Sequence, residues 1–340
     1  MLVMRLTLAE IAKRAQVSIA SVSRFYKDRD SVSPETRQKI EQAVKELGTP
    51  LRVGRKKRSI TIALLVPDIE NPFFANLVKN IELFISRSGC FLLLCNTSGG
   101  PSLEEKYLDL LEGHHVDGII FVPSGRWDES FVEKINRVLL PVVVLDRAVE
   151  GLRVPLVLCD NEEGGRMATE YLLRLGRKKI AFISGKKGVS TSWERLIGYR
   201  RALEENGIGL RKELIFEGDF TFQSGVEVAK HIVDNRVEVD AIFAANDFMA
   251  LGAIDVLKKR GVKIPEDISV VGYDDIWLSR ICEPSLTTVR QPIFEMCESA
   301  VGILLRSIRS GKVDSPQRLV LKPELVVRES CLRLSGKGGD

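Results

Sequence analysis

Hydrophobic and polar residues alternate in a regular pattern along most of the chain, from residue 60 onward. Short apolar runs with the length of buried strands occupy residues 60–66, 91–95, 118–122, 142–145, 179–183, 241–244 and 269–272. Amphipathic helical stretches separate them, at residues 74–88, 103–112, 162–175, 194–205, 225–234 and 247–259. Strand–helix alternation with continuous apolar strands predicts parallel sheets covered by helices on both faces. The units are too many for one sheet, and a break near Cys159 and Asp160 predicts two similar lobes.

The first 50 residues have a different pattern, which predicts three short helices. Thr7 and Glu10 form a capping box at the start of the first helix, and Ser18 can cap a second helix over residues 19–27. Pro34 occupies the first position of a third helix, which we expect to end at Gly48. This spacing is typical of a helix-turn-helix module, whose second helix enters the major groove of DNA. A three-helix protein-interaction module with a solvated basic face is the alternative.

The residue types on the second helix suit contact with DNA. Small or hydrogen-bonding side chains that can approach base edges are Ile19, Ala20, Ser21 and Arg24, and Arg24 can bind guanine with two hydrogen bonds. Side chains that suit phosphate contacts are Ser23, Tyr26 and Lys27. We also place Thr7 and Ser18, at the starts of the first two helices, among the DNA-binding residues.

The charge distribution supports a polyanion-binding head on a separate body. Residues 1–60 contain 14 Lys and Arg against 6 Asp and Glu, whereas the rest of the chain contains 36 against 40. Part of this excess is a basic run in residues 51–59, which we interpret as a linker. Its residues Arg52, Arg55, Lys56 and Lys57 are predicted to contact the DNA backbone, although such a run can also be only a solvated linker.

Several other classes of protein are disfavoured by composition. No stretch of about 20 apolar residues could span a membrane, and the N-terminus does not have the pattern of a secretion signal, so we expect a cytoplasmic protein with reduced cysteines. The three histidines are too few and too poorly spaced for a metal site or a catalytic triad. Phosphate-binding loops and nucleophile elbows are missing, so we expect no enzyme activity and no cofactor. A transport protein would need a signal peptide and would have no DNA-binding head.

Ligands of parallel sheets bind outside the carboxyl ends of the strands, so polar and aromatic residues that follow the apolar runs are candidates. They are residues 71–74, Asp146-Arg147, Asn246-Asp247 and Tyr273-Asp274-Asp275, of which Asp247 is better explained as a helix cap. Carboxylates, an amide, a guanidinium and aromatic faces together can bind a polyhydroxylated ligand.

The head strongly resembles the LacI/GalR family of bacterial repressors. The matching segments are Leu8-Ala9-Glu10-Ile11-Ala12, Val17-Ser18, Ser21-Val22-Ser23-Arg24, Val32-Ser33 and Thr36-Arg37. The resemblance implies that Ile19, Ala20 and Arg24 select the operator sequence. Members of this family usually have a hinge helix with a leucine that enters the minor groove, but Gly54 and the basic run stand in its place here. We therefore expect weak or no bending of the DNA.

The body resembles the same family up to about residue 330. The matching segments are Asn71-Pro72-Phe73-Phe74, Arg195-Leu196-Ile197-Gly198-Tyr199, Ala245-Asn246-Asp247, Ala250-Leu251-Gly252, Val270-Val271-Gly272-Tyr273-Asp274-Asp275 and Pro284-Ser285-Leu286-Thr287-Thr288-Val289-Arg290-Gln291. The resemblance implies a fold like that of periplasmic sugar-binding proteins, with chain crossings near residues 159, 289 and 322. It places Arg195 and Asp274 on the hydroxyls of the effector. Further pocket positions are Phe73, Phe74, Asp146, Phe220 and Asn246, with Phe220 as a stacking ring.

These inferences define the expected architecture. A small all-α helix-turn-helix head (1–50) and a linker (51–59) precede a two-lobed α/β sensor (60–331). Lobe 1 comprises residues 60–159 and 290–321, and lobe 2 comprises residues 160–289 and 322–331. The leucine-rich tetramer-forming tail of the family is missing, so we expect a homodimer on a near-palindromic operator. A sugar is the favoured effector and a purine-like corepressor is the alternative; whether the effector releases the DNA or promotes binding stays open.

Overall fold

The computed structural model describes residues 8–47, 60–113, 116–125, 127–311 and 316–331. The Thr7 side of the predicted capping box, the end of the third helix at Gly48 and the basic linker therefore lie outside the described residues. The chain divides into two compact units, Met1–Ser59 and Ile60–Asp340, which correspond to a head and a body. Among the described residues, no helix has both the length and the apolar character needed to span a membrane.

The head consists of three α-helices and one short 3₁₀ turn. They are α1 (Leu8–Ala15), α2 (Ile19–Lys27), η1 (Arg29–Ser31) and α3 (Pro34–Glu46). The predicted caps are present: the hydroxyl of Ser18 accepts a hydrogen bond from the amide of Ser21, and Ser33 caps α3 just before Pro34. Gln16, in the turn between α1 and α2, has a φ of 54°. This left-handed residue reverses the chain between the two helices.

The head has its own small hydrophobic core. Val22 and Phe25 of α2 are fully buried and pack against α1 and α3. The opposite side of α2 is exposed as a consequence, and it carries Ile19, Ala20 and Arg24. Leu8, at the start of α1, is 42% exposed.

The body contains two six-stranded sheets, one in each lobe. The sheet of lobe 1 has the order β11-β5-β4-β3-β1-β2 and is parallel throughout. Its strands are β1 (Thr61–Val66), β2 (Phe91–Asn96), β3 (Gly118–Phe121), β4 (Val142–Leu145), β5 (Leu156–Cys159) and β11 (Arg318–Leu321). The sheet of lobe 2 has the order β12-β10-β9-β8-β6-β7, and only β12 is antiparallel. Its strands are β6 (Ile180–Ile183), β7 (Ile215–Phe216), β8 (Ala241–Ala244), β9 (Ser269–Asp274), β10 (Thr287–Arg290) and β12 (Glu324–Val326).

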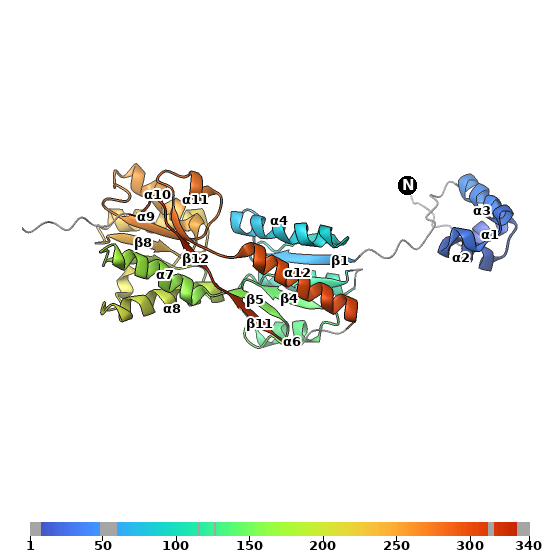
Figure 1. Ribbon diagram of the computed structural model, residues 1–340, viewed down its shortest axis with the longest axis horizontal. Coiled ribbons are helices and arrows are strands. Elements are labelled where there is room, and N and C mark those ends of the chain that lie inside the picture. The colour runs from blue at the N-terminus through green and yellow to red at the C-terminus, as the bar shows by residue number, and fades with distance from the viewer. Residues whose placement is uncertain (1–7, 48–59, 114–115, 126, 312–315, 332–340) are drawn as a thin grey trace, which may run out of the picture. The chain divides into compact units, whose positions relative to one another are not determined.

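Helices cover both faces of each sheet. In lobe 1, α4 (Pro72–Arg87) and α12 (Ile293–Ser310) lie side by side, as Figure 1 shows. Residues of β1 alternate between the hydrophobic core under these two helices and a second core on the other face of the sheet. That opposite core includes α5 (Pro101–Glu112) and α6 (Glu129–Arg137). Lobe 2 carries α7 (Asn161–Arg174), α8 (Ser190–Glu205), α9 (Phe222–Asp234), α10 (Asp247–Lys259) and the short α11 (Leu278–Ile281). A helical head followed along the chain by two lobes with mainly parallel sheets confirms the predicted fold class.

The chain passes between the two sheets three times. The passages join β5 to α7 around Asp160, β10 to α12 around Gln291, and β11 to β12 at Lys322 and Pro323. Strands β5, β7, β10, β11 and β12 and helices α6, α11 and α12 lie outside the predicted ranges. Of the missing strands, β7, β11 and β12 are half-buried or exposed and β10 begins with two threonines, so none has the pattern of a buried apolar strand. β5 does have a continuous apolar run, which the prediction overlooked.

Candidate functional site

The carboxyl ends of two central strands carry acidic residues in strained backbone conformations. Asp146 follows β4 in lobe 1 with a φ of 70°, and Asp274 and Asp275 close β9 in lobe 2 with φ values of 108° and 52°. Residues other than glycine rarely adopt a left-handed conformation, which costs free energy and persists where the surrounding structure imposes it. The strain therefore marks the strand ends between the lobes as a candidate site.

Arg195 of α8 is the centre of this site. It is 3% exposed, and its Nε donates to Asn161 Oδ1 at 2.9 Å. Its Nη1 donates to the carbonyl of Ala245, and its guanidinium carbon lies 3.6 Å from the ring centroid of Tyr273. Its Nη2 lies 3.6 Å from Oδ1 of Asp274. Contacts on all sides fix the guanidinium in one position, as a pre-organised binding site requires.

The two acidic side chains near Arg195 are shifted away from the ordinary titration of a carboxyl group. Burial raises the pKa of Asp274 to about 7, although Arg195 and the amide of Gln291 lower it. Burial likewise raises the pKa of Asp146, against the charges of Arg147 and Arg195. A carboxyl group that titrates near neutral pH can both donate and accept hydrogen bonds, which suits a ligand with hydroxyl groups.

Several polar atoms around the strand ends are buried and have no hydrogen-bond partner among the described residues. They are Oδ1 of Asp146, Oε1 of Gln291 and the hydroxyl of Ser124. An unsatisfied buried polar group costs about 1–3 kcal/mol. Asp146 and Gln291 lie next to Arg195 and Asp274, and Ser124 lines the neighbouring cleft with Arg147, which is the pattern expected of a site that a polar ligand completes.

A cleft of about 510 Å³ opens beside this polar cluster, between segments of the two lobes. Phe74 from lobe 1 and Phe220 from lobe 2 line it, and the guanidinium of Arg147 lies between their rings, 5.2 Å and 5.5 Å from the two centroids. The ring of Phe220 covers Gly185 so closely that a Cβ there would lie 1.9 Å from it. Aromatic faces and polar groups are thus combined in one cleft.

The other sequence-predicted pocket residues have structural contacts. Phe73 is 3% exposed and packs edge-to-face on Phe74 in the core of lobe 1. Asn246 caps α10 by accepting from the amide of Met249, and its Nδ2 donates to the carbonyl of Phe220. The prediction that Asp247 caps this helix is wrong, because Asn246 is the cap. Asp247 is instead buried and accepts hydrogen bonds from the Thr288 hydroxyl and the Ile276 amide.

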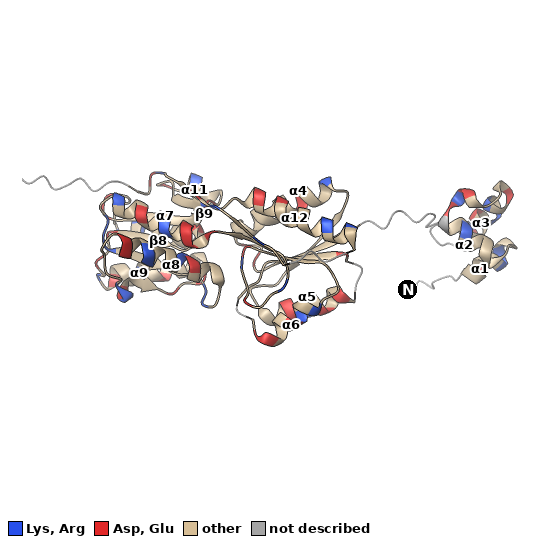
Figure 2. Cartoon of the chain, turned by 60° about the horizontal axis from the view of Figure 1, so that its bottom comes forward, with Lys and Arg blue, Asp and Glu red and all other residues tan. Residues whose placement is uncertain are grey.

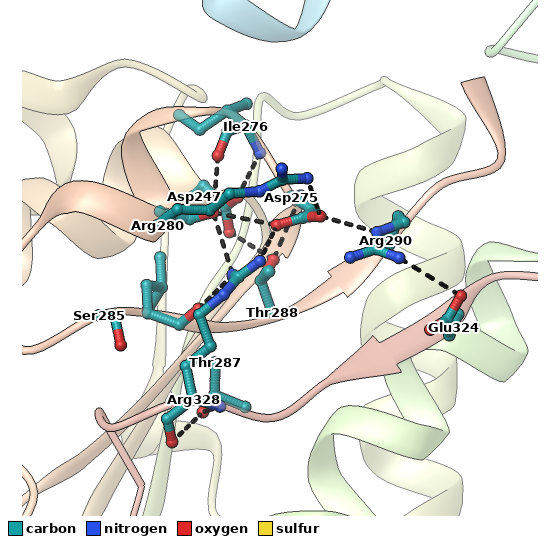
Figure 3. Close-up of polar contacts among 12 residues, drawn as sticks. Asp247, Asp275, Ile276, Arg280, Ser285, Thr287, Thr288, Arg290, Glu324 and Arg328 are labelled. Carbon is teal, nitrogen blue, oxygen red and sulfur yellow. Dashed lines mark hydrogen bonds and ion pairs between the residues drawn. The ribbon is translucent and has the colours of Figure 1, made fainter. Parts of the chain in front are cut away.

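Asp275 organises a network that sequence analysis missed, although the residue stood in a candidate segment. Its carboxylate accepts hydrogen bonds from Arg280 at 3.2 Å, from Arg290 at 2.7 Å and from Arg328 at 2.5 Å (Figure 3). These arginines come from α11, β10 and the segment after β12, so no local sequence pattern connects them. Burial alone would raise the pKa of Asp275, but the hydrogen bonds from Arg328 and Arg290 lower it.

Gln291 is the second residue of the site that sequence analysis did not single out. It lies in the passage from β10 to α12 and donates from Nε2 to Asp274 Oδ1 at 2.8 Å. In the sequence, Gln291 was named only as the last residue of a segment that resembles the LacI/GalR family. Among the described residues, no cluster of three or more His, Cys, Asp or Glu side chains could hold a metal ion.

The head presents the candidate DNA-binding residues on one helix. Ile19 is 55% exposed, Ala20 and Arg24 are exposed, and Ser21, Ser23 and Tyr26 are half-buried. The hydroxyl of Ser18 is exposed and lies 2.9 Å from that of Ser21. The side chain of Lys27 and the residues Thr7, Arg52, Arg55, Lys56 and Lys57 lie outside the described part of the chain.

Charge pairing distinguishes Arg24 from the other described arginines of the head. The head as a whole carries both signs of charge, as Figure 2 shows. Arg14 pairs with Glu46, and Arg29 pairs with Glu41. Arg24 forms no ion pair with any described residue, so its guanidinium is available to an external partner.

Comparisons with known proteins agree with both units. Residues 7–48 match the family model "Bacterial regulatory proteins, lacI family", and residues 169–331 match "Periplasmic binding protein-like domain". The transcriptional regulator DegA of Bacillus subtilis is 37% identical over 98% of this chain and 100% of its own length. The ribose operon repressor of Halalkalibacterium halodurans is 36% identical over 98% of both chains. A solved complex of the regulator CelR with cellobiose superposes with a TM-score of 0.73 at 35% identity, over 96% of this chain and 100% of that chain.

The helix-turn-helix head and the two-lobed body define a DNA-binding transcriptional regulator with a ligand-binding sensor domain. The chain belongs to the LacI family of bacterial regulatory proteins.

Proposed function

We propose that this protein is a cytoplasmic repressor whose affinity for operator DNA is controlled by a sugar bound between the lobes of its body. The observation that carries the proposal is the set of buried, unpartnered polar atoms around Asp274 and Arg195. The relatives support a sugar, because one is named a ribose operon repressor and another is solved with cellobiose. Since relatives are named as transcriptional regulators and repressors, we propose no enzyme activity.

In this proposal, Asp146, Arg195, Asp274 and Gln291 hold the hydroxyls of the sugar. The rings of Phe74 and Phe220 pack against its apolar side in the cleft. Asn246 and Phe73 do not contact the sugar themselves; their contacts hold the Phe220 loop and the Phe74 ring in place. Aromatic faces and pre-placed polar groups together give a sugar site its orientation and its specificity.

The operator is read by α2. Ile19, Ala20 and Arg24 face outward while Val22 and Phe25 anchor the helix, so the exposed side can enter a major groove. The half-buried hydroxyls of Ser21 and Ser23 and that of Tyr26 suit phosphate and edge contacts. The basic linker adds contacts to the DNA backbone.

We also propose that the body forms a homodimer. Lobe 2 has an apolar groove of about 660 Å³, lined by residues of α9, α10 and α11 that include Phe222, Leu251 and Ile281. Ile281 is 66% exposed, which is costly for a large apolar side chain unless a partner covers it. A twofold dimer places two heads on the two halves of a near-palindromic operator.

The proposal is tested by measuring DNA affinity with and without sugar. Operator fragments are first selected with the full-length protein from genomic or random DNA, and binding is followed by fluorescence anisotropy in the presence of ribose, glucose or cellobiose. A coupling free energy of about 1–3 kcal/mol would change operator affinity about 5- to 150-fold. Asp274→Ala should remove the response and leave DNA binding intact, whereas Arg24→Ala should weaken DNA binding and leave sugar binding intact. Sugar-independent operator affinity across a wide panel would contradict the proposal.

A further inference from the structure

The space between the lobes has a second, larger opening that the proposed sugar site does not use. It encloses about 940 Å³ and lies between the β3–α6 and β4–β5 connections of lobe 1 and the start of α8 in lobe 2. Its lining includes Trp127, Glu129, Glu150, Val189, Ser190 and Trp193. A cleft of this size can bury most of a ligand with the dimensions of a drug-sized molecule.

This second cleft adjoins the first. Val189 lines both clefts, and the adjacent Ser190 accepts a hydrogen bond from the amide of Ala148, which follows Arg147 of the first cleft. Trp193 lies two residues before Arg195 on α8, so the two side chains point to different sides of the helix, Trp193 to the wider opening and Arg195 to the buried polar cluster. The two clefts meet at Val189, so one ligand can extend from the first cleft into the wider one.

Two tryptophans provide apolar faces in the wider opening. Trp193 is 57% exposed, although large aromatic side chains normally bury most of their surface. Trp127 is held by stacking on Phe131, with ring centroids 3.6 Å apart and an interplanar angle of 16°. Its Nε1 is buried and has no hydrogen-bond partner among the described residues. The two indole rings suit a ligand that has flat apolar surfaces.

The charges of the wider opening limit the kind of ligand. Glu129, Glu133 and Glu150 line it, against Arg153 as the basic side chain in the described lining. Glu133 is paired with Arg137, while Glu129 and Glu150 are exposed to the cleft and solvent. Carboxylates accept hydrogen bonds from hydroxyl groups and repel phosphates. The opening therefore favours an uncharged, hydroxyl-rich ligand over a phosphorylated one.

We propose that the wider cleft is an extension of the effector site that binds the second and third units of an unphosphorylated oligosaccharide. Trp193 is the residue that makes the protein prefer di- and trisaccharides to monosaccharides. This inference rests on the proposed function as a sugar-responsive repressor and adds the class of sugar. In this arrangement the buried polar cluster holds one sugar unit, and the next units lie across the faces of Trp193 and Trp127.

The inference is tested with two matched series of sugars on the full-length protein. They are glucose, cellobiose and cellotriose, and glucose, maltose and maltotriose, with glucose 6-phosphate as the charged probe. Affinity is measured by calorimetry for the unaltered protein, for Trp193→Ala and for Trp277→Ala. Trp277 is a matched control, since it is 61% exposed and does not line either cleft. In a parallel assay the emission of the chain's three tryptophans is followed during titration.

We expect affinity to rise with chain length in one of the two series, by about tenfold or more from the monosaccharide to the disaccharide, and no binding of glucose 6-phosphate. Trp193→Ala should weaken disaccharide binding about tenfold, a loss of about 1.4 kcal/mol in binding free energy. It should leave the monosaccharide affinity unchanged. Trp277→Ala should have no effect on either. Equal affinity for all chain lengths, with no effect of Trp193→Ala, would overturn the extension and leave a monosaccharide sensor intact. If no sugar of either series binds, both the extended site and the proposal that the effector is a sugar are overturned.

Discussion

Replacing Asp274 by Asn should make the protein more stable at alkaline pH while it removes the response to ligand. The side chain is buried, and burial raises the pKa of Asp274 to about 7, from an unfolded value of about 3.9. Between pH 4 and pH 7 the folded protein therefore keeps a proton that the unfolded chain releases. Stability must fall as pH rises through this window, because the folded state then binds more protons.

The size of the effect follows from the two pKa values. At pH 5 the carboxyl of Asp274 lowers the free energy of unfolding by about 1.5 kcal/mol relative to a neutral side chain, and at pH 8 by about 4 kcal/mol. The difference between pH 5 and pH 8 is therefore about 2.5 kcal/mol. An Asn at this position keeps the shape, accepts from Gln291 and tolerates the left-handed φ of 108°. The guanidinium of Arg195 keeps its hydrogen bonds to Asn161 and Ala245, so its positive charge still has hydrogen-bond acceptors.

Urea unfolding of both proteins at pH 5 and pH 8, at one protein concentration, measures this difference directly. Other titrating groups contribute equally to both proteins and cancel in the comparison. The stability of Asp274→Asn relative to the unaltered protein should rise by about 2.5 kcal/mol between the two pH values. Glu227→Gln, which removes an exposed carboxylate, serves as the control and should show no such change. An equal stability difference at both pH values would refute a raised pKa at Asp274.

Three further predictions concern other parts of the molecule. Arg24→Ala should weaken operator binding about 10- to 100-fold in anisotropy titrations, without a change in melting temperature, because the exposed guanidinium forms no ion pair with any described residue. Asp275→Asn should lower the free energy of unfolding by about 2–4 kcal/mol at pH 7, since it removes the counter-charge of Arg328, whose side chain is only 13% exposed. As the pKa of Asp275 is lowered, this loss should shrink below about pH 4. Gly165→Ala should cost about 1–3 kcal/mol in urea unfolding, because its Cβ would lie 2.3 Å from the carbonyl of Arg195. Gly302→Ala, whose Cβ would lie 3.6 Å from its nearest neighbour, Nη1 of Arg306, should not destabilise the protein.

The fold was predictable from the sequence at most of the continuous apolar runs, although that of β5 was overlooked. The strand run at residues 142–145 and the helical pattern at residues 247–259 match β4 and α10 residue for residue. Helix α12 was missed although its apolar residues follow helical spacing, because the strands on either side of it, β10 and β11, gave no signal of their own. Pairing with neighbouring strands in the sheet, rather than intrinsic propensity, fixes such short strands.

The candidate site was predictable in part. Strand ends in a parallel sheet meet at one edge, so Asp146 and Asp274 could be named from sequence alone. The network around Asp275 could not, because Arg280 and Arg290 lie on other elements of lobe 2 and Arg328 follows the return of the chain from lobe 1. The role of Asn246 was also out of reach, since an Asn and an Asp in tandem are equally good helix caps by sequence.

The arrangement of contacts between lobes explains how a small ligand could control this regulator. A ligand shifts an equilibrium only by the difference in its affinity for the two states. Direct polar contacts across the lobes include Lys186 Nζ to the carbonyl of Gly99 at 3.0 Å and Ala148 N to Ser190 Oγ at 3.0 Å. Both lie at the rim of the clefts, while the buried cluster still contains unpartnered atoms. A sugar that satisfies these atoms adds contacts available in only one arrangement of the lobes, and that difference is the free energy with which it acts on the head.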